Sequence, residues 1–235
     1  MPRPAKGAVP RALTAAIEYG VSRAGLAAAR VLDRDVIGQA HDPHGPAGRV
    51  TAWEMAHRPS NRQRSRWAVS LLDIQPGDRA LELGFGPGVA IAALARAGAA
   101  HVYGVDHSGV MLRQASKRNA AAIRAGRITL IRASADQLPP ALDGPFDAIL
   151  AVNSLGFWPA PGQRIAELRR RLAPGGRMAI ASQPRCPGAT ADTSRGAARE
   201  IEGLLSDAGF THLSTHTLPL NPPAVCVLAR LRPEG

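Results

Sequence analysis

A chain of 235 residues is long enough for one domain with a single hydrophobic core and a modest appendage. Hydrophobic residues make up 45% of it, but no stretch approaches the roughly 18 uninterrupted apolar residues of a membrane-spanning helix, so we expect a soluble globular protein. Lysine and arginine number 29 against 18 acidic residues, and the charge of +11 suits an anionic partner without specifying a fold. Cys186 and Cys226 stand far apart without a CxxC pair, which excludes a disulfide framework and a zinc finger.

The first part of the chain, residues 1–70, is predicted to form an arm and a helical cap. Residues 1–12 are basic and rich in proline without the apolar segment of a secretory signal, so we expect a mobile arm and a cytoplasmic protein. Apolar residues recur at three- and four-residue spacing over 13–35, which predicts an amphipathic helix with a basic face. This helix either packs on the core or makes peripheral contact with a membrane surface. Glycines and prolines over 38–50 predict a loop, and residues 51–72 are again helical in pattern.

Arginines crowd around aromatic side chains within residues 51–72. An exposed, solvated helix face accounts for such a run, and the same pattern suits an acidic substrate or a nucleic acid. Trp53, His57 and Arg62 are candidates here for contact with a substrate. His57 is also a weak candidate for a general base, with an ordinary surface histidine as the alternative. The other histidines are scattered without metal-ligand spacing, so no metal site is expected.

From Asp73 onward short apolar strands alternate with helices. Five strands joined by helices predict a doubly wound parallel sheet. The last two apolar segments are joined only by Asn221, Pro222 and Pro223, a link so short that they must form an antiparallel hairpin. The predicted fold class is therefore α/β, a Rossmann-like sheet of seven strands. Strands are predicted at 79–85, 101–106, 128–134, 146–153 and 177–183, helices at 88–98, 109–125, 161–173 and 197–208, a turn at 173–176, and the hairpin over 211–220 and 224–232.

A glycine-rich turn, LELGFGPG, joins the first strand of this sheet to the following helix. Glycines there let the backbone approach a ligand closely, and the helix that begins at Gly88 presents free N–H groups to an anion. Asp106 ends the next strand, where it can accept both hydroxyl protons of a ribose. The spacing is GxGxG rather than the GxGxxG of dinucleotide oxidoreductases, and Glu82 precedes it where a pyrophosphate would be repelled. The Glu82 carboxylate would instead attract the ammonium group of an amino acid.

These residues resemble the class I S-adenosylmethionine-dependent methyltransferases, and the resemblance covers about residues 70–235. The turn from Glu82 to Gly88 matches their E/DxGxGxG pattern, and Asp106 matches the acid that ends their second strand. Further matches follow in the family's order: ASADQLP from Ala133, FDAILAVN ending at Asn153, the Pro174-Gly175-Gly176 turn and the closing hairpin. The resemblance implies that residues 71–235 are an S-adenosylmethionine-binding methyltransferase domain.

The same resemblance implies which residues hold the cofactor, S-adenosyl-L-methionine. The glycine turn receives its methionine part, and Met111 packs on the adenine. Ser134 stands where the family usually has an acid, so the backbone of Ala135 is expected to contribute at the adenine edge. The implied set is Glu82, Gly84, Phe85, Gly86, Gly88, Asp106, His107, Met111, Ser134, Ala135, Asp136 and Asn153.

The sequence on both sides of the glycine turn is similar to that of small bacterial ubiquinone/menaquinone-biosynthesis-like and phospholipid-methyltransferase-like members of this family. The predicted function is therefore methyl transfer to a small aromatic, quinone-like or lipid-like acceptor. Phe157 and Trp158, after the fourth strand, are further candidates for acceptor contact, and Trp158 is a weak catalytic candidate. An RNA methyltransferase and a non-catalytic binder of the cofactor are the alternatives. The charge favours RNA, whereas the absence of an RNA-binding module and of an N/DPPY-type tetrad opposes it.

Overall fold

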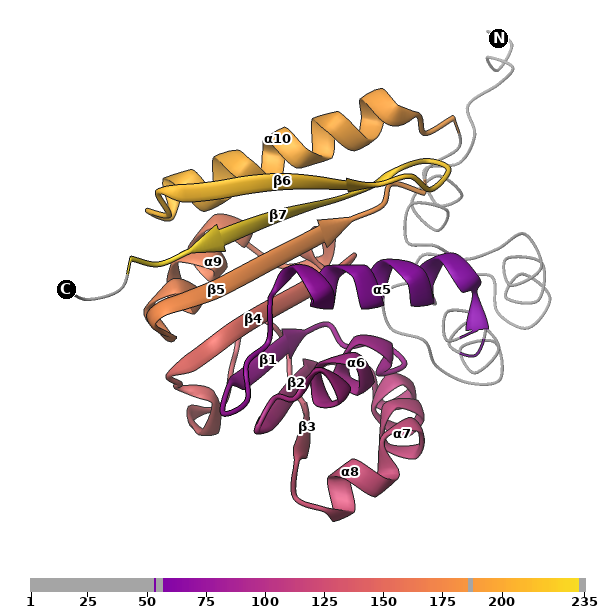
Figure 1. Cartoon of the computed structure of the whole chain (residues 1–235), viewed down its shortest axis with the longest axis vertical. Coiled ribbons are helices and arrows are strands. Elements are labelled where there is room, and N and C mark those ends of the chain that lie inside the picture. The colour runs from indigo at the N-terminus through magenta and orange to yellow at the C-terminus, as the bar shows by residue number, and fades with distance from the viewer. Residues whose placement is uncertain (1–52, 54–56, 186–187, 233–235) are drawn as a thin grey trace, which may run out of the picture.

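The structure, a computed structural model, describes residues 53, 57–185 and 188–232 (Figure 1). The predicted arm, the helix over 13–35 and the loop over 38–50 lie outside these residues. One seven-stranded sheet runs through the described chain in the order β3-β2-β1-β4-β5-β7-β6. Helices cover both of its faces (Figure 1). This architecture confirms the predicted Rossmann-like α/β fold.

The sheet is parallel from β3 to β5 and antiparallel at its other edge. β7 runs antiparallel to β5 on one side and to β6 on the other, so the hairpin predicted from its short Asn-Pro-Pro link is confirmed. The parallel pairs are β2 with β3, β1 with β2, β1 with β4, and β4 with β5. The strands are β1 (Arg79–Leu83), β2 (His101–Asp106), β3 (Ile128–Arg132), β4 (Phe146–Val152), β5 (Leu172–Ser182), β6 (His212–Leu218) and β7 (Ala224–Arg230).

Helices α5, α6 and α7 pack on one face of the sheet, and α9 and α10 pack on the other (Figure 1). Two short 3₁₀ turns, η1 and η2, flank β4. No helix of the described residues is both long and apolar enough to cross a membrane. The helical segments are α5 (Pro59–Leu71), α6 (Val89–Ala97), α7 (Gly109–Arg118), α8 (Ala120–Arg124), α9 (Pro161–Arg170), α10 (Ala191–Asp207), η1 (Pro140–Leu142) and η2 (Leu155–Phe157).

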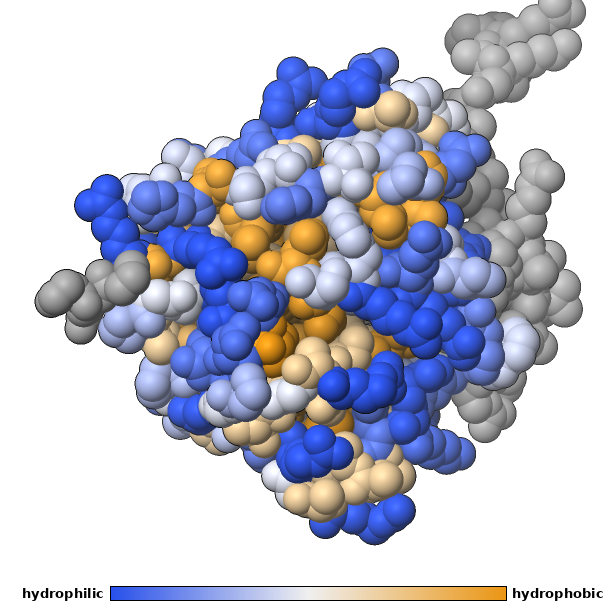
Figure 2. All heavy atoms as spheres, viewed as in Figure 1, coloured by the Kyte–Doolittle hydropathy of each residue, from blue (hydrophilic) through white to orange (hydrophobic). Residues whose placement is uncertain are grey.

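Alternate residues of the strands supply two separate hydrophobic layers. Ala80 on β1 and Leu150 on β4 face α5 and α6, whereas Leu81 and Ile149 face α9 and α10. Because side chains alternate across a sheet, a strand covered on both faces has to be apolar at nearly every position. Glu82 shares the face of Ala80 and is an exception to this pattern. Figure 2 shows hydrophilic side chains around this face of the molecule and apolar ones near its middle, over β5 and β7.

Two predicted segments differ from the structure because single side chains interrupt or extend them. The helix predicted over 109–125 is broken at Asn119 into α7 and α8. The buried Asn119 amide donates to the carbonyls of Ala115 and Gly88, at 2.9 and 3.2 Å, and these bonds compete with the helical pattern. Helix α10 begins before the predicted 197 because Thr190 and Thr193 form a capping box at its start.

Two other boundaries are set by the backbone. The turn predicted over 173–176 lies inside β5, which shifts its register against β4 at this point. The amide of Leu231 donates to the carbonyl of Gly176 at 2.9 Å, so the segment stays paired beyond the end of β7. In the helix predicted over 51–72, an extended Arg58 precedes Pro59, and α5 starts at that proline.

Candidate active site

A pocket of about 270 Å³ opens between α5 and the carboxyl ends of β1, β2 and β4. Parallel strands bring their carboxyl ends to the same edge of a sheet, so segments far apart in the sequence meet there. Phe157 and Trp158, the two acceptor candidates after β4, line the pocket. The residues predicted for the cofactor that line it are Glu82, Gly84, Phe85, Gly86, Asp106, His107, Met111, Ser134, Ala135 and Asn153.

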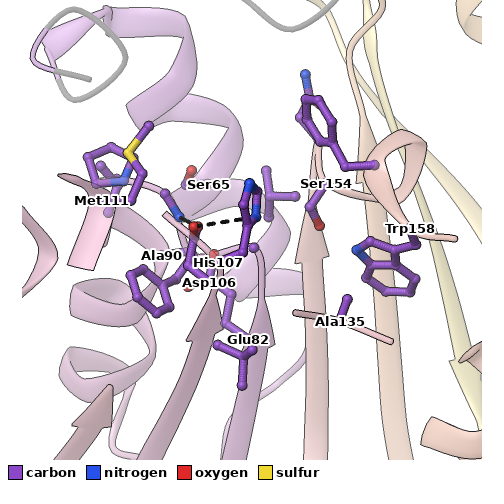
Figure 3. Close-up of a pocket in the computed structure, with 18 of the residues that line it drawn as sticks. Ser65, Glu82, Ala90, Asp106, His107, Met111, Ala135, Ser154 and Trp158 are labelled. Carbon is purple, nitrogen blue, oxygen red and sulfur yellow. Dashed lines mark hydrogen bonds and ion pairs between the residues drawn. The ribbon is translucent and has the colours of Figure 1, made fainter. Parts of the chain in front are cut away.

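Asp106 ends β2, and two backbone amides fix its buried carboxylate. Oδ2 accepts a hydrogen bond from the Gly86 amide at 2.8 Å, and Oδ1 accepts one from the Ser108 amide at 2.9 Å. His107 lies beside it, with Nδ1 3.9 Å from Oδ1 (Figure 3). An ionised carboxylate accepts up to about four hydrogen bonds. Asp106 can therefore hold the glycine turn and a ligand hydroxyl at the same time.

The three glycines of the turn have positive φ angles for different reasons. A Cβ on Gly84 would lie 2.4 Å from Ser154 Cβ, and a Cβ on Gly88 would lie 2.7 Å from the Asn119 amide nitrogen. Packing inside the protein therefore accounts for these two positions. A Cβ on Gly86 would meet no atom of the described residues within 4 Å. Gly86 thus presents bare backbone to the pocket, as a closely approaching ligand requires.

Glu82 places a carboxylate in the core at the end of β1 (Figure 3). Its side chain accepts a hydrogen bond from the Ile91 amide, but Oε2 has no hydrogen-bond partner among the described residues. Burial, followed by the charge of Asp106, raises the pKa of the Glu82 carboxyl well above its ordinary value. A buried carboxylate without a cation is costly, and a positively charged ligand group beside it would offset that cost.

Two polar residues after β4 hold the wall of the pocket in place. The Asn153 side chain exchanges two hydrogen bonds with the backbone of Gln183, at 2.8 Å to its amide and 3.1 Å to its carbonyl. The Ser154 hydroxyl donates to the carbonyl of Leu83 at 2.7 Å. These bonds tie the end of β4 to β5 and β1. Trp158 lies further along this segment, buried, across the pocket from Met111 in Figure 3.

Helix α5 contributes three pocket residues that the sequence analysis missed, Asn61, Arg64 and Ser65. They lie three and four positions apart and therefore share one helix face. The same spacing continues through Ala68, which is fully buried in the core. Once the helix start at Pro59 is known, this periodicity identifies the face of α5 that is turned toward the sheet.

Five predicted site residues lie away from this pocket. Gly88 packs against α7, and Asp136 is exposed on the loop after β3. Trp53 is 58% exposed and stacks on His57 with ring centroids 4.4 Å apart. His57 and Arg62 line a separate surface hollow at the start of α5, and the His57 ring bonds to the Trp53 carbonyl at 2.7 Å. These three residues therefore do not face the strand ends.

Comparison with known proteins decides the family. A family model described as a methyltransferase domain matches residues 80–176. The uncharacterized methyltransferase YdaC of Bacillus subtilis (strain 168) is 31% identical over 173 residues, which span 72% of this chain and 92% of that protein. The chain belongs to the class I S-adenosylmethionine-dependent methyltransferases. This methyltransferase also shares its fold with N-methyltransferase NodS from Bradyrhizobium japonicum WM9, solved in complex with S-adenosyl-L-homocysteine, at a TM-score of 0.63 and 19% identity over 88% of this chain and 99% of that one.

A second relative is the ubiquinone/menaquinone biosynthesis C-methyltransferase UbiE of Geotalea daltonii. It is 33% identical over 122 residues, which span 51% of this chain and 52% of that protein. The match thus covers about half the length of this relative. Within the described part of the methyltransferase, no group of three or more His, Cys, Asp or Glu side chains is placed to hold a metal ion.

Proposed function

We propose that the pocket holds S-adenosylmethionine and that the methyl group passes to a small aromatic, quinone-like or lipid-like acceptor. The observation that carries this proposal is the pair of buried carboxylates at neighbouring strand ends (Figure 3). Asp106, fixed by two amides, suits the hydroxyls of a ribose. Glu82, with one oxygen unpartnered among the described residues, suits an ammonium group. The cofactor carries both groups.

The remaining walls fit the other parts of the cofactor. Gly86 leaves open space for the methionine part, since no atom of the described part of the chain lies within 4 Å of the position that its Cβ would take. Met111, Ser134 and Ala135 form the side assigned to the adenine, where the polarisable sulfur of Met111 suits an aromatic ring. Asp136 acts from outside the pocket, where the hydrogen bond from the Ser134 side chain lowers the pKa of the Asp136 carboxyl. Asp136 is therefore expected to orient Ser134 from outside the pocket.

When bound, S-adenosylmethionine supplies a methyl group carried on a sulfonium. In-line displacement transfers the methyl group to the acceptor, and the sulfur leaves as a neutral thioether. The protein therefore needs no nucleophile of its own, and among the described residues neither Lys nor Cys lines the pocket. Its task is to hold the acceptor in line and to exclude water. Positioning of this kind can contribute roughly 7 to 11 kcal/mol to the lowering of the barrier. A general base is needed only for an acceptor that loses a proton during attack.

The acceptor assignment is supported by the walls beyond the cofactor region. Phe157, Trp158 and Val152 give this part of the pocket an apolar, partly aromatic surface. Such surfaces stack on planar rings and bury lipid-like groups. The similarity to the ubiquinone/menaquinone biosynthesis C-methyltransferase of Geotalea daltonii favours a quinone-like ring within this class.

Calorimetry with S-adenosylmethionine, S-adenosylhomocysteine and NADH, side by side, tests the cofactor site. Both sulfur ligands are expected to bind and NADH is not, because the turn carries GxGxG spacing and Glu82 opposes a pyrophosphate. Transfer of a radiolabelled methyl group to quinols, phenols, lipids and RNA then tests the acceptor. Binding of NADH alone would overturn the cofactor assignment, and labelling of RNA alone would overturn the acceptor class.

Gly86→Ala tests the close approach of the ligand, with Gly126→Ala as a matched control. Both glycines have positive φ, 50° and 68°, and at either position an added Cβ meets no atom within 4 Å in the part of the chain that the structure describes. Each substitution is expected to cost about 1 to 2 kcal/mol of stability. Only Gly86→Ala is expected to weaken cofactor binding, by about tenfold or more. Equal affinities in the two variants would remove Gly86 from the site.

A further inference from the structure

The α5 wall of the pocket carries a buried arginine. Arg64 is 5% exposed and lines the pocket together with Asn61 and Ser65. Its Nη1 donates to Gln183 Oε1 at 2.7 Å, and its Nη2 donates to Asn61 Oδ1 at 3.2 Å. The Nε–H is buried and has no hydrogen-bond partner among the described residues. A desolvated guanidinium with an unused Nε–H donor at a cavity wall calls for an acceptor that the described residues do not supply.

Arg185, which follows β5, brings a second positive charge to the same place. Its Nη2 donates to Gln183 Oε1 at 2.6 Å and to Ser60 Oγ at 2.8 Å. Gln183 is itself fixed, because its Nε2 donates to the carbonyl of Pro222 at 2.8 Å. Two guanidinium groups therefore converge on one uncharged amide oxygen.

No carboxylate balances these charges within the part of the chain that the structure describes. The ion pairs formed there involve neither Arg64 nor Arg185. Burial, then the charges of Arg185 and Arg58, lowers the pKa of Arg64 to about 9. Burial, then the charge of Arg58, lowers the pKa of Arg185 to about 10. Both shifts reflect burial of positive charge and repulsion between neighbouring guanidinium groups, a cost that a bound anion would offset.

We propose that Arg64 and Arg185, with Gln183 between them, form a subsite for a carboxylate or phosphate group on the α5 wall of the pocket. The planar fork of a guanidinium matches the oxygens of either group and binds them bidentately. The inference rests on the proposed function, because Arg64 lines the pocket assigned to the methyl donor and acceptor, and Arg185 reaches Arg64 through their shared bond partner Gln183. The anion has two sources there, the carboxylate of the methionine part of the cofactor or an acidic group on the acceptor.

Arg64→Met is the main test variant, and Arg66→Met is its matched control. Arg66 lies on the same helix but is exposed. Replacing a buried, incompletely satisfied charge by an apolar chain of similar volume is not expected to destabilise the protein. Arg185→Met, at a half-buried position, removes the second charge and leaves Arg64 in place. Arg64→Lys keeps the charge and loses the fork.

Inorganic sulfate probes the subsite without cofactor or acceptor. At constant ionic strength set with sodium chloride, sulfate is expected to raise the melting temperature of the wild type and of Arg66→Met. Arg64→Met is expected to lose this protection, Arg185→Met to lose part of it, and Arg64→Lys to retain less than the wild type. This readout holds even if the proposed function fails, because it requires neither methyl donor nor turnover.

Two further arms identify the source of the anion. If it is the cofactor carboxylate, Arg64→Met raises the dissociation constant of S-adenosylmethionine about 10- to 100-fold and leaves that of decarboxylated S-adenosylmethionine unchanged. If it is the acceptor, cofactor affinity is unchanged, and KM rises by a similar factor for acidic acceptors but not for their neutral analogues. Failure of the wild type to bind either methyl donor would contradict the proposed function, and the sulfate result alone would then decide on the subsite.

Equal sulfate protection in the wild type, Arg64→Met and Arg66→Met, together with equal ligand affinities and KM values, would overturn the subsite. Loss of protection in Arg64→Met and Arg66→Met alike would also overturn it, because the effect would then come from the general charge of α5.

Discussion

Glu82 meets different electrostatic conditions in the folded and unfolded protein. Burial, followed by the charge of Asp106, raises the pKa of its carboxyl in the folded state well above the ordinary value of 4.5. Between these two pKa values the folded protein keeps a proton that the unfolded chain releases. The resulting contribution to the free energy of unfolding is complete below pH 4.5 and is lost as the pH rises through the raised pKa.

Glu82→Gln removes this titration and preserves the shape of the side chain. Because glutamine resembles a protonated carboxyl, the variant and the wild type are expected to be equally stable near pH 4.5. Above that pH the melting temperature of the cofactor-free variant is expected to rise relative to that of the cofactor-free wild type. Glu200→Gln, at an exposed position on α10, is the control and is expected to show no such gain. A wild type more stable than Glu82→Gln above neutral pH would count against this account.

Cofactor binding is expected to make the ionised form of the Glu82 carboxyl the favoured one. An ammonium group beside the carboxylate favours its ionised form, so binding drives off the proton that the free protein holds. Calorimetry in buffers of different ionisation enthalpy is expected to detect this release in the wild type and not in Glu82→Gln. The variant is also expected to bind more weakly. Proton release that persists in the variant would assign it to another group.

At the scale of elements, strands were easier to predict than helix boundaries. β2 occupies the predicted 101–106 because a run that is apolar on both faces ends at a charged residue. Helix ends depend on the hydrogen bonds of particular side chains, either to a neighbour within one turn, as for Thr190, or to a residue far along the chain, as for Asn119. Thr190 moves the start of α10, and Asn119 breaks the predicted helix through a bond to Gly88. Periodicity carries no information about such partners.

Asn119 connects the end of α7 to the end of the glycine turn, and Asn119→Ala tests this connection. The substitution removes two side-chain hydrogen bonds, to the carbonyls of Gly88 and Ala115, while each carbonyl keeps one backbone N–H donor. We expect a loss of about 1 to 3 kcal/mol in the free energy of unfolding, measured by urea denaturation. Lys117→Ala, on the exposed face of α7, is expected to stay close to the wild type. Equal losses in the two variants would show that helix propensity, and not this connection, sets the effect.

In the site as well, features set by a local motif were easier to predict than features set by packing. Residues of the glycine turn and the ends of β1, β2 and β4 were predictable, because each belongs to a local motif at a strand end. The α5 residues were not, because their role depends on which helix face meets the sheet. Arg62 and Arg64 look alike in the sequence, yet only Arg64 lines the pocket. The helix start at Pro59 and the buried Ala68 separate them once packing is known.

At the scale of the whole molecule, a buried ion pair fixes α5 and its pocket residues to the sheet. Arg177 on β5 pairs with Asp78, just before β1. Its guanidinium also donates to the carbonyl of Leu72 at 2.7 Å and to that of Asp73 at 3.2 Å, immediately after α5. The hydrophobic layer runs on through Ala68 of α5 into the strands. Within the described residues, α5 and the sheet therefore share one core, although the predicted division at residue 70 passes through the end of this helix.

Arg177→Met tests whether α5 and the sheet unfold as one unit. It leaves Asp78 buried without its partner, so we expect a loss of about 3 to 5 kcal/mol in the free energy of unfolding. Arg230→Met is the matched control, since Arg230 lies opposite Arg177 in the β5–β7 pairing but is exposed. Denaturation is followed by circular dichroism for the sheet and, with Trp53 and Trp158 replaced by phenylalanine in every variant, by the fluorescence of Trp67, which packs on the core from α5. Coincident transitions that shift together in Arg177→Met, and not in Arg230→Met, are expected for one cooperative unit. A fluorescence transition that separates from the sheet transition in the wild type would show that α5 is an independent element, and the pocket wall that carries Arg64 would then be able to open without unfolding the rest.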